Sequence, residues 1–139
     1  MKILFLLIFL TLSLFSDQNN IKAKIIATVL DNLYSKEQKI VFSDDKVLLD
    51  KLSSHYKTTN RCMDSNFLIL QHWVELSDSC KKKKIFVLNY NLLYDIPQSF
   101  GAFFFKKGRA NVVLLKDKLE KNGITPSKRL EPYVEDKLW

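Results

Sequence analysis

Glycine is scarce in this sequence, with three residues among 139. The loops that hold nucleotide phosphates in P-loop proteins and in dinucleotide-binding domains need glycines at short, fixed spacings. Gly101, Gly108 and Gly123 match neither spacing. The sequence therefore predicts no nucleotide cofactor.

Proline is equally scarce, at three residues, and no segment is rich in glycine and proline. The chain also shows no internal repeat and no low-complexity tract. Without such features it offers no boundary between domains. We predict one α/β domain over residues 17–139, preceded by a short N-terminal segment.

Histidine and cysteine are too few for a convincing metal or catalytic site. His55 and His72 are isolated, with no second ligand-type residue at metal spacing. Cys62 and His72 lack the sequence of a nucleophile elbow, and a disulfide would consume the thiol. Asp44 and Asp45 are explained by helix capping. We expect a non-enzymatic protein without catalytic residues, metal ligands or cofactor.

Cys62 and Cys80 are the two cysteines of the chain. An even number of cysteines in an exported protein predicts a disulfide. A loop of this size would contribute roughly 3 kcal/mol by the chain-entropy model. A redox-sensing pair is the functional alternative, and it requires an exposed or strained bond.

An apolar run spans residues 3–15, directly after Lys2. It is shorter than the roughly 20 residues of a membrane span, and polar residues follow at once. The pattern predicts a secretory signal peptide over residues 1–16 and a periplasmic protein. An uncleaved N-terminal anchor is the alternative, because Leu14 and Ser16 match the cleavage rule imperfectly.

The chain is basic, with 22 lysines and arginines against 15 acidic residues. Removal of residues 1–16, which contain one lysine, leaves a net charge of 22 − 1 − 15 = +6. Export argues against nucleic acid, so an anionic membrane surface or an acidic protein partner is expected. Solubility alone is the plainer explanation of the same excess.

Residues 100–123 hold two apolar runs, 103–105 and 112–115, joined by a charged turn that contains Gly108. Two such runs around a short glycine-containing turn predict a β-hairpin. The charged residues that follow suit an exposed helix ending at Gly123. Strands this apolar need cover on both faces, so the rest of the chain must pack around the hairpin.

Hydrophobic period and capping signals predict the other elements. The expected strands are residues 39–42, a polar edge strand within 56–60, 67–70 and 85–88. The expected helices are residues 21–34, 44–54 (burying Val47, Leu48 and Leu52), a turn or short helix over 72–76, and a C-terminal tail with Pro132 near its start. The segment from Asn89 to Pro97 is expected to be a loop.

This order of elements predicts a single-domain α/β sandwich, in which a small mixed β-sheet is flanked by helices. The strands beginning near residues 40, 67 and 85 are expected to be parallel. The C-terminal β-hairpin is expected to form an antiparallel edge, with a helix after it.

The predicted hairpin carries the candidate binding residues. Lys106, Lys107 and Arg109, with Asn111 beside them, could bind a small anion, since glycine lets backbone N–H groups approach a ligand. A solvated turn is the plainer interpretation. The three phenylalanines of 103–105 cannot all face one way on a strand. At least one must be covered by a helix or exposed as a docking surface.

Residues 101–130 resemble the C-terminal half of the YfiR-like periplasmic regulator family. The family pattern is a strand, a charged glycine turn, a strand, a helix closing on a Gly-Leu or Gly-Ile pair, and a short final helix. Gly108 and Gly123 are 15 residues apart, with Ile124 following, which is the family's spacing. Leu115 stands where the family usually has asparagine, and the family's aromatic-Trp-Pro start is absent. With the two buried strands upstream, the resemblance covers about two-thirds of the chain.

The resemblance implies a periplasmic regulator that binds and restrains a membrane-bound diguanylate cyclase, often as a homodimer, without enzyme activity. We therefore expect a partner surface formed by Phe103, Phe104, Phe105, Lys106, Lys107, Arg109 and Asn111. The alternative is a small solute- or anion-binding module resembling one lobe of a periplasmic substrate-binding protein, with the anion near the strand ends. A structural protein of the envelope is the third reading.

Overall fold

The computed structural model describes residues 18–138, and its main element is a seven-stranded sheet. The predicted signal peptide, residues 1–16, lies outside the described residues. The strands of the sheet are β2 (Ile40–Ser43), β3 (Lys57–Thr58), β4 (Phe67–Leu70), β5 (Lys84–Val87), β6 (Gly101–Lys106), β7 (Arg109–Leu115) and β9 (Val134–Glu135). The described helices are residues 18–31, α2 (Lys46–Leu52), η1 (Cys62–Asp64), α3 (Asp78–Lys81), α4 (Leu92–Asp95), α5 (Lys116–Lys121) and η2 (Lys128–Tyr133), where η marks a 3-10 helix.

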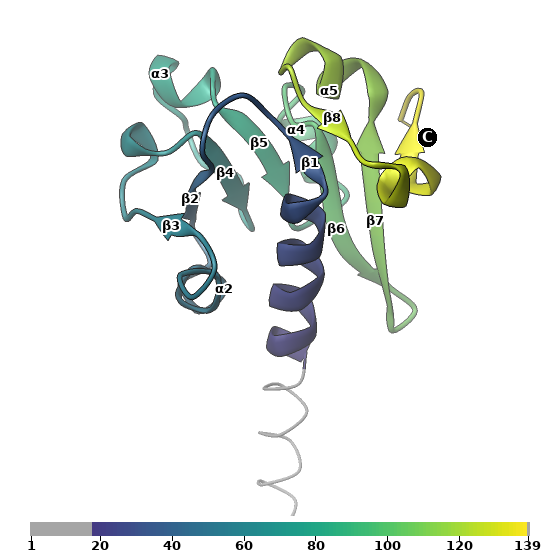
Figure 1. The fold of residues 1–139 in the computed structure, drawn as a ribbon, viewed down its shortest axis with the longest axis horizontal. Coiled ribbons are helices and arrows are strands. Elements are labelled where there is room, and N and C mark those ends of the chain that lie inside the picture. The colour runs from purple at the N-terminus through teal and green to yellow at the C-terminus, as the bar shows by residue number, and fades with distance from the viewer. Residues whose placement is uncertain (1–17, 139) are drawn as a thin grey trace, which may run out of the picture.

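The strands are ordered β3-β2-β4-β5-β6-β7-β9 across the sheet (Figure 1). The first five of these run parallel, β7 runs antiparallel to β6, and β9 runs parallel to β7. The predicted α/β class and mixed sheet are therefore confirmed. A second, two-stranded sheet pairs β1 (Leu33–Tyr34) with β8 (Thr125–Pro126) and ties the end of helix 18–31 to the C-terminal region.

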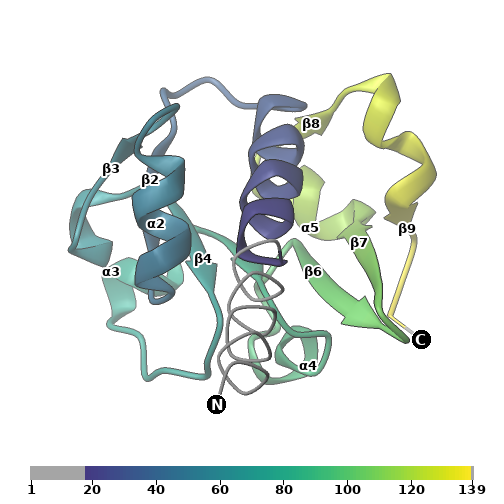
Figure 2. The ribbon, with the colours of Figure 1, turned by 90° about the horizontal axis from the view of Figure 1, so that it is seen from below.

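Both faces of the sheet are buried, and each has its own apolar cluster. Strand β4 shows the division, because Phe67 and Ile69 join one cluster while Leu68 and Leu70 join the other. Helix 18–31, α2 and α5 contribute to the first cluster, and α3 and α4 to the second. In Figure 2, helix 18–31 and α4 lie on opposite sides of the sheet. Burial on both faces explains why the central strands are continuously apolar in sequence.

The hairpin forms as predicted, with Lys107 and Gly108 as its two turn residues. Both have positive φ, 53° and 75° respectively. Positive φ at both turn residues gives a two-residue hairpin turn the twist that matches its flanking strands. The helix that follows, α5, also ends as predicted, at Gly123 with φ 65°. There the amide of Ile124 donates to Leu119 O at 2.9 Å and satisfies a carbonyl of the last turn.

Several sequence predictions about individual elements are wrong. Val47 is 51% exposed, whereas Leu49 is buried with Leu48 and Leu52, because the register of α2 turns Leu49 inward. The segment 72–76 contains no helix; the helix begins later, at α3, where the Ser77 side chain accepts from the Cys80 amide.

The helix predicted over residues 21–34 covers residues 18–31 instead, and Leu33–Tyr34 form β1. The other errors lie in the C-terminal half. The predicted loop 89–97 contains α4, which forms because Leu92 and Leu93 are buried against the sheet. Pro132 lies near the end of η2 rather than near its start. The hairpin is not the edge of the sheet throughout, because β9 pairs with Leu114 and Leu115 of β7. A two-residue strand such as β9 has no periodic signal in the sequence.

Gly101 allows β7 to pack closely against β6. A Cβ placed there would lie 2.5 Å from Val113 O and 2.8 Å from Leu114 Cδ2. The oxygen belongs to the paired backbone and cannot move without disturbing the ladder. We expect Gly101→Ala to lower the free energy of unfolding by roughly 2–4 kcal/mol in urea denaturation.

Gly108→Ala is the control for this substitution. Its Cβ would meet nothing within 4 Å, so only the positive φ opposes it, at a cost of roughly 1–2 kcal/mol. A smaller loss at Gly101 than at Gly108 would contradict the steric argument.

Candidate functional site

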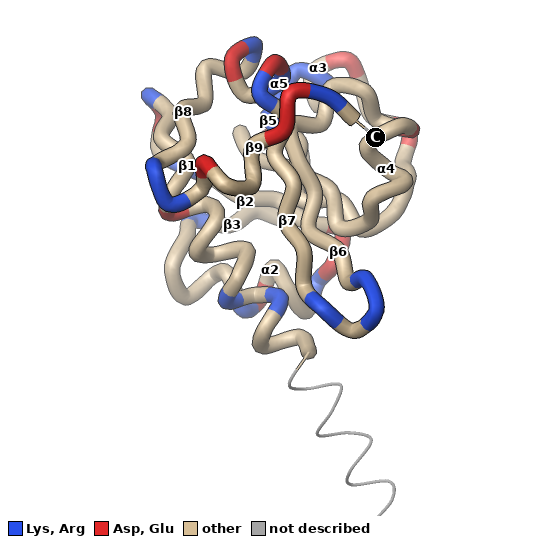
Figure 3. Tube along the Cα trace, turned by 90° about the vertical axis from the view of Figure 1, so that its right-hand side faces the viewer, with Lys and Arg blue, Asp and Glu red and all other residues tan. Residues whose placement is uncertain are grey.

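The turn of the hairpin projects beyond the end of the sheet and carries a concentrated positive charge (Figure 3). Lys106, Lys107 and Arg109 are all exposed. The ion pairs found among residues 18–138 are Lys22–Asp45 and Arg61–Asp64, so none of the three cations at the turn is neutralised within this part of the chain. An unneutralised cluster of this kind attracts acidic groups of a partner.

The three phenylalanines of β6 have three different environments. Phe103 is 1% exposed and belongs to the cluster under helix 18–31. Phe104 faces the opposite way, half-buried, with its ring centroid 5.1 Å from that of Tyr90. Phe105 is 43% exposed and stacks edge-on against Phe103 at 5.2 Å. The alternation follows from strand geometry, and Phe105 is the ring that solvent reaches most.

Two grooves run beside the hairpin, one on each face of the sheet. The larger has a volume of about 670 Å³ and is lined by β6 and β7 together with Tyr90, Pro132, Tyr133 and Glu135. The smaller, of about 380 Å³, lies between β7, helix 18–31 and η2. Val112 and Tyr133 line both grooves. Strand β7 therefore separates two surface grooves.

A shallow hollow of about 460 Å³ lies at the turn itself, among Lys106, Lys107, Arg109 and Asn111. The structure thus brings together these four predicted residues. Asn111 Nδ2 donates to Arg109 O at 2.9 Å, which links two of the residues that line the hollow. Because the cations are exposed, the hollow suits an acidic side chain of a docked protein better than a sequestered small anion.

The solute-binding alternative places an anion near the strand ends, and at the carboxyl end of β4 the protein's own Asp44 carboxylate is bound. Asp44 accepts from the backbone amides of Gln71 and His72 at 2.6 and 3.0 Å. These amides are the groups that would otherwise face an anion at the end of β4. At this strand end the two amides are therefore already bound by Asp44.

Asp45, next along the chain, caps α2 by accepting from the Leu48 amide. The Lys22 ammonium lies 2.6 Å from its carboxylate and 3.1 Å from Gln71 Oε1. Burial alone would raise the pKa of Asp45, but the bonds from Lys22 and Leu48 outweigh burial and lower this pKa below its usual value. The cluster anchors helix 18–31 to the strand ends, which is a structural role.

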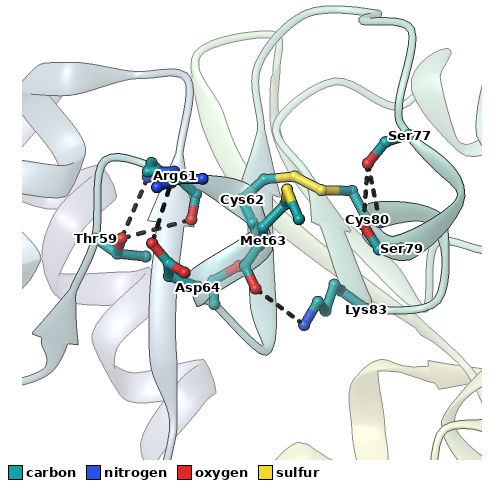
Figure 4. Close-up of a disulfide and its surroundings, with 10 residues drawn as sticks. Thr59, Arg61, Cys62, Met63, Asp64, Ser77, Ser79, Cys80 and Lys83 are labelled. Atoms are coloured by element: carbon teal, nitrogen blue, oxygen red, sulfur yellow. Dashed lines mark hydrogen bonds and ion pairs between the residues drawn. A yellow bond between two sulfur atoms is a disulfide. The ribbon is translucent and has the colours of Figure 1, made fainter.

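Cys62 and Cys80 form a disulfide that joins η1 to α3 (Figure 4). Their Cα atoms are 6.1 Å apart, within the normal range. Cys80 is 1% exposed. A hydrogen bond from Lys83 Nζ to Met63 O, 3.4 Å long, also links η1 to the residues just after α3. The predicted pairing is confirmed at the level of geometry. The burial of Cys80 favours a structural staple, and the redox-sensing alternative stays a hypothesis.

Within residues 18–138 there is no group of three or more His, Cys, Asp or Glu side chains arranged to hold a metal ion. The same residues contain no helix that is both long and apolar enough to cross a membrane. Compared with protein-family models and with curated proteins, the chain matches none. The case for a function therefore rests on the hairpin and its surroundings.

The sequence did not indicate that residues from the C-terminal region help to line the grooves. Pro132, Tyr133 and Glu135 are distant from the hairpin in sequence and reach it through the pairing of β9 with β7. Tyr90 reaches it through the segment before α4. Nothing in the local pattern around these residues indicates that they share a groove with Phe104, because this depends on the order of the strands.

Proposed function

We propose that this is an exported, non-enzymatic regulatory protein that binds the periplasmic part of a membrane signalling protein of the diguanylate-cyclase type. The single observation that carries the proposal is the projecting hairpin. Three cations at its turn, which have no ion-pair partner among residues 18–138, lie beside an exposed aromatic ring, Phe105. Exposed aromatic and arginine side chains are the residues that most often dominate the energetics of protein interfaces.

The order of elements supports the same proposal. Strand β6, the charged turn, strand β7, helix α5 before Gly123, strand β8 and the short helix η2 follow one another in the segment on which the resemblance to the YfiR-like regulators is based. A disulfide at bonding distance is compatible with an exported protein, because such bonds persist in oxidising compartments. The class of partner comes from the resemblance, and the hairpin provides the surface.

The proposal is tested by capture from a membrane extract of the source organism. The full chain is expressed, purified and immobilised, and the captured proteins are identified by mass spectrometry. We expect a transmembrane protein with a cytoplasmic GGDEF domain. Phe105→Glu or Arg109→Glu should reduce capture by about tenfold or more, equivalent to about 1.4 kcal/mol.

Lys36→Glu is the matched control, because Lys36 is an exposed lysine in the loop between β1 and β2, remote from the turn. It makes the same charge reversal as Arg109→Glu and should leave capture unchanged. Circular dichroism checks that each variant is folded. Capture of transporter subunits instead of a signalling protein, or equal capture by all variants, would overturn the proposal.

A further inference from the structure

One edge of strand β7 has free backbone hydrogen-bonding groups. In the hairpin, Arg109 pairs with Lys106, and the Leu115 amide donates to Phe100 O at 2.8 Å. Alternate residues of an antiparallel strand point their N–H and C=O groups to the same side. The odd-numbered residues from Arg109 to Leu115 therefore face β6, and Ala110, Val112 and Leu114 face the other way.

On that outer side, β9 pairs with β7 at Leu114 and Leu115. No strand among residues 18–138 pairs with the outer groups of Ala110 and Val112. Two N–H and two C=O groups are thus open to a ligand. Figure 3 looks onto this side of β7, with β9 at its upper end and the basic turn at its lower end.

The two grooves described above lie on either side of this open edge. Ala110 and Val112 line the smaller groove, which helix 18–31 and η2 complete. Asn111 and Phe104 line the larger one on the opposite face. A strand added to the edge would direct successive side chains alternately into the two grooves, because strand side chains alternate between faces.

We propose that the open edge of β7 binds an extended segment of a partner protein by β-strand addition. The segment would have apolar side chains at alternate positions and an acidic side chain at the end beside Lys106, Lys107 and Arg109. Main-chain hydrogen bonds to Ala110 and Val112 would supply affinity, and the grooves and the turn would supply selectivity. The inference rests on the proposed binding function and specifies the chemistry of the partner.

Two features favour a free segment over a second copy of this chain. Val134 and Glu135 occupy the outer side of β7 next to the open part, and Tyr133 lines both grooves at that boundary. A second copy pairing through its own β7 would bring its own β9 and Tyr133 against the first hairpin. An antiparallel pair centred on Asn111 would place Arg109 where the other copy's Tyr133 lies. An extended partner segment has no β9 or Tyr133 of its own, so it can pair with Ala110 and Val112 without this overlap.

The test is selection of a random peptide library, displayed on phage, against the full-length protein. Selected peptides should alternate apolar residues and carry Asp or Glu at one end. In the free protein, amide hydrogen exchange followed by NMR should be fast at Ala110 and Val112 and slower at Asn111. Binding of a selected synthetic peptide should slow exchange at Ala110 and Val112.

Ala110→Pro removes one open N–H while leaving the bonds to β6 intact, a position where an edge strand tolerates proline. It should weaken binding of the selected peptide by about tenfold or more, while Ala110→Ser, which keeps the N–H, should bind as the parent does. Should Ala110→Pro not fold, the exchange rates of the unmodified protein still decide the question. Peptides without the alternating pattern, no selected peptides, unchanged exchange, or association of the protein with itself at this edge would overturn the inference.

Comparison of the parent protein with Ala110→Pro also separates this inference from the proposed function. If the parent protein captures a membrane signalling protein and Ala110→Pro captures it equally well, the function stands and strand addition is wrong. If the parent captures no such protein but selects alternating peptides whose binding Ala110→Pro abolishes, the edge is a binding site and the proposed function is wrong.

Discussion

Replacing Phe100 with alanine should lower the free energy of unfolding by about 3–5 kcal/mol, the range observed for fully buried phenylalanines. Phe100 has no exposed surface and directly precedes β6, and its amide donates to Ile85 O of β5 at 2.8 Å. Its ring centroid is 6.1 Å from that of Phe67 and 5.7 Å from that of Phe86. Truncation would leave a cavity that β5 and β7 cannot close, because both strands are held in place by hydrogen bonds to the backbone of Phe100.

Urea denaturation followed by circular dichroism measures the effect. Phe105→Ala is the matched control, since the same side chain is removed five residues away where it is 43% exposed. We expect this control to cost less than about 1 kcal/mol. Equal losses for the two variants would mean that Phe105 is buried in solution, against both the structure and its proposed role in binding.

Reduction of the Cys62–Cys80 disulfide should destabilise the folded protein by about 3 kcal/mol in the chain-entropy model, because the closed loop spans 18 residues. The loop contains η1, β4 and α3. Strand β4 lies between β2 and β5 in the sheet, so the loop must become ordered when the protein folds. Without the disulfide the unfolded loop has more conformational entropy to lose, which lowers the free energy of unfolding. The urea midpoint with and without dithiothreitol measures the effect on one and the same polypeptide.

The control for reduction is the double variant Cys62→Ala with Cys80→Ala. Dithiothreitol should not change its midpoint, and its stability should lie close to that of the reduced parent protein. An unchanged midpoint on reduction of the parent would show that the bond does not constrain the unfolded chain. The structural-staple interpretation would then be wrong, and the redox-sensing alternative would gain support.

Much of the fold was predictable because its signals are local. The apolar run at Phe67–Leu70 predicts a strand buried on both faces, and the structure confirms one. Lys107 and Gly108 form the turn that the sequence predicts between two apolar runs. Asp45 caps α2 through a bond to an amide three residues away. In each case a residue and its near neighbours contain all the information needed.

The candidate site could be predicted only in part. The sequence indicates that the aromatic residues of 103–105 cannot share one face, and that the turn is basic. It does not indicate which ring is exposed, because that depends on the helix 18–31 covering Phe103 and on the segment around Tyr90 covering Phe104. Those contacts join parts of the chain that are far apart in sequence.

Residue type and short-range spacing were enough to predict the α/β class, the hairpin, the cysteine pairing and the concentration of charge at the turn. The three-dimensional structure was needed to show that α4 interrupts the predicted loop, that Val47 faces solvent and that β9 joins β7. The position of β9 leaves Ala110 and Val112 as the open part of the edge. Strand order is set by which apolar faces bury one another, and a single local pattern is compatible with several such orders.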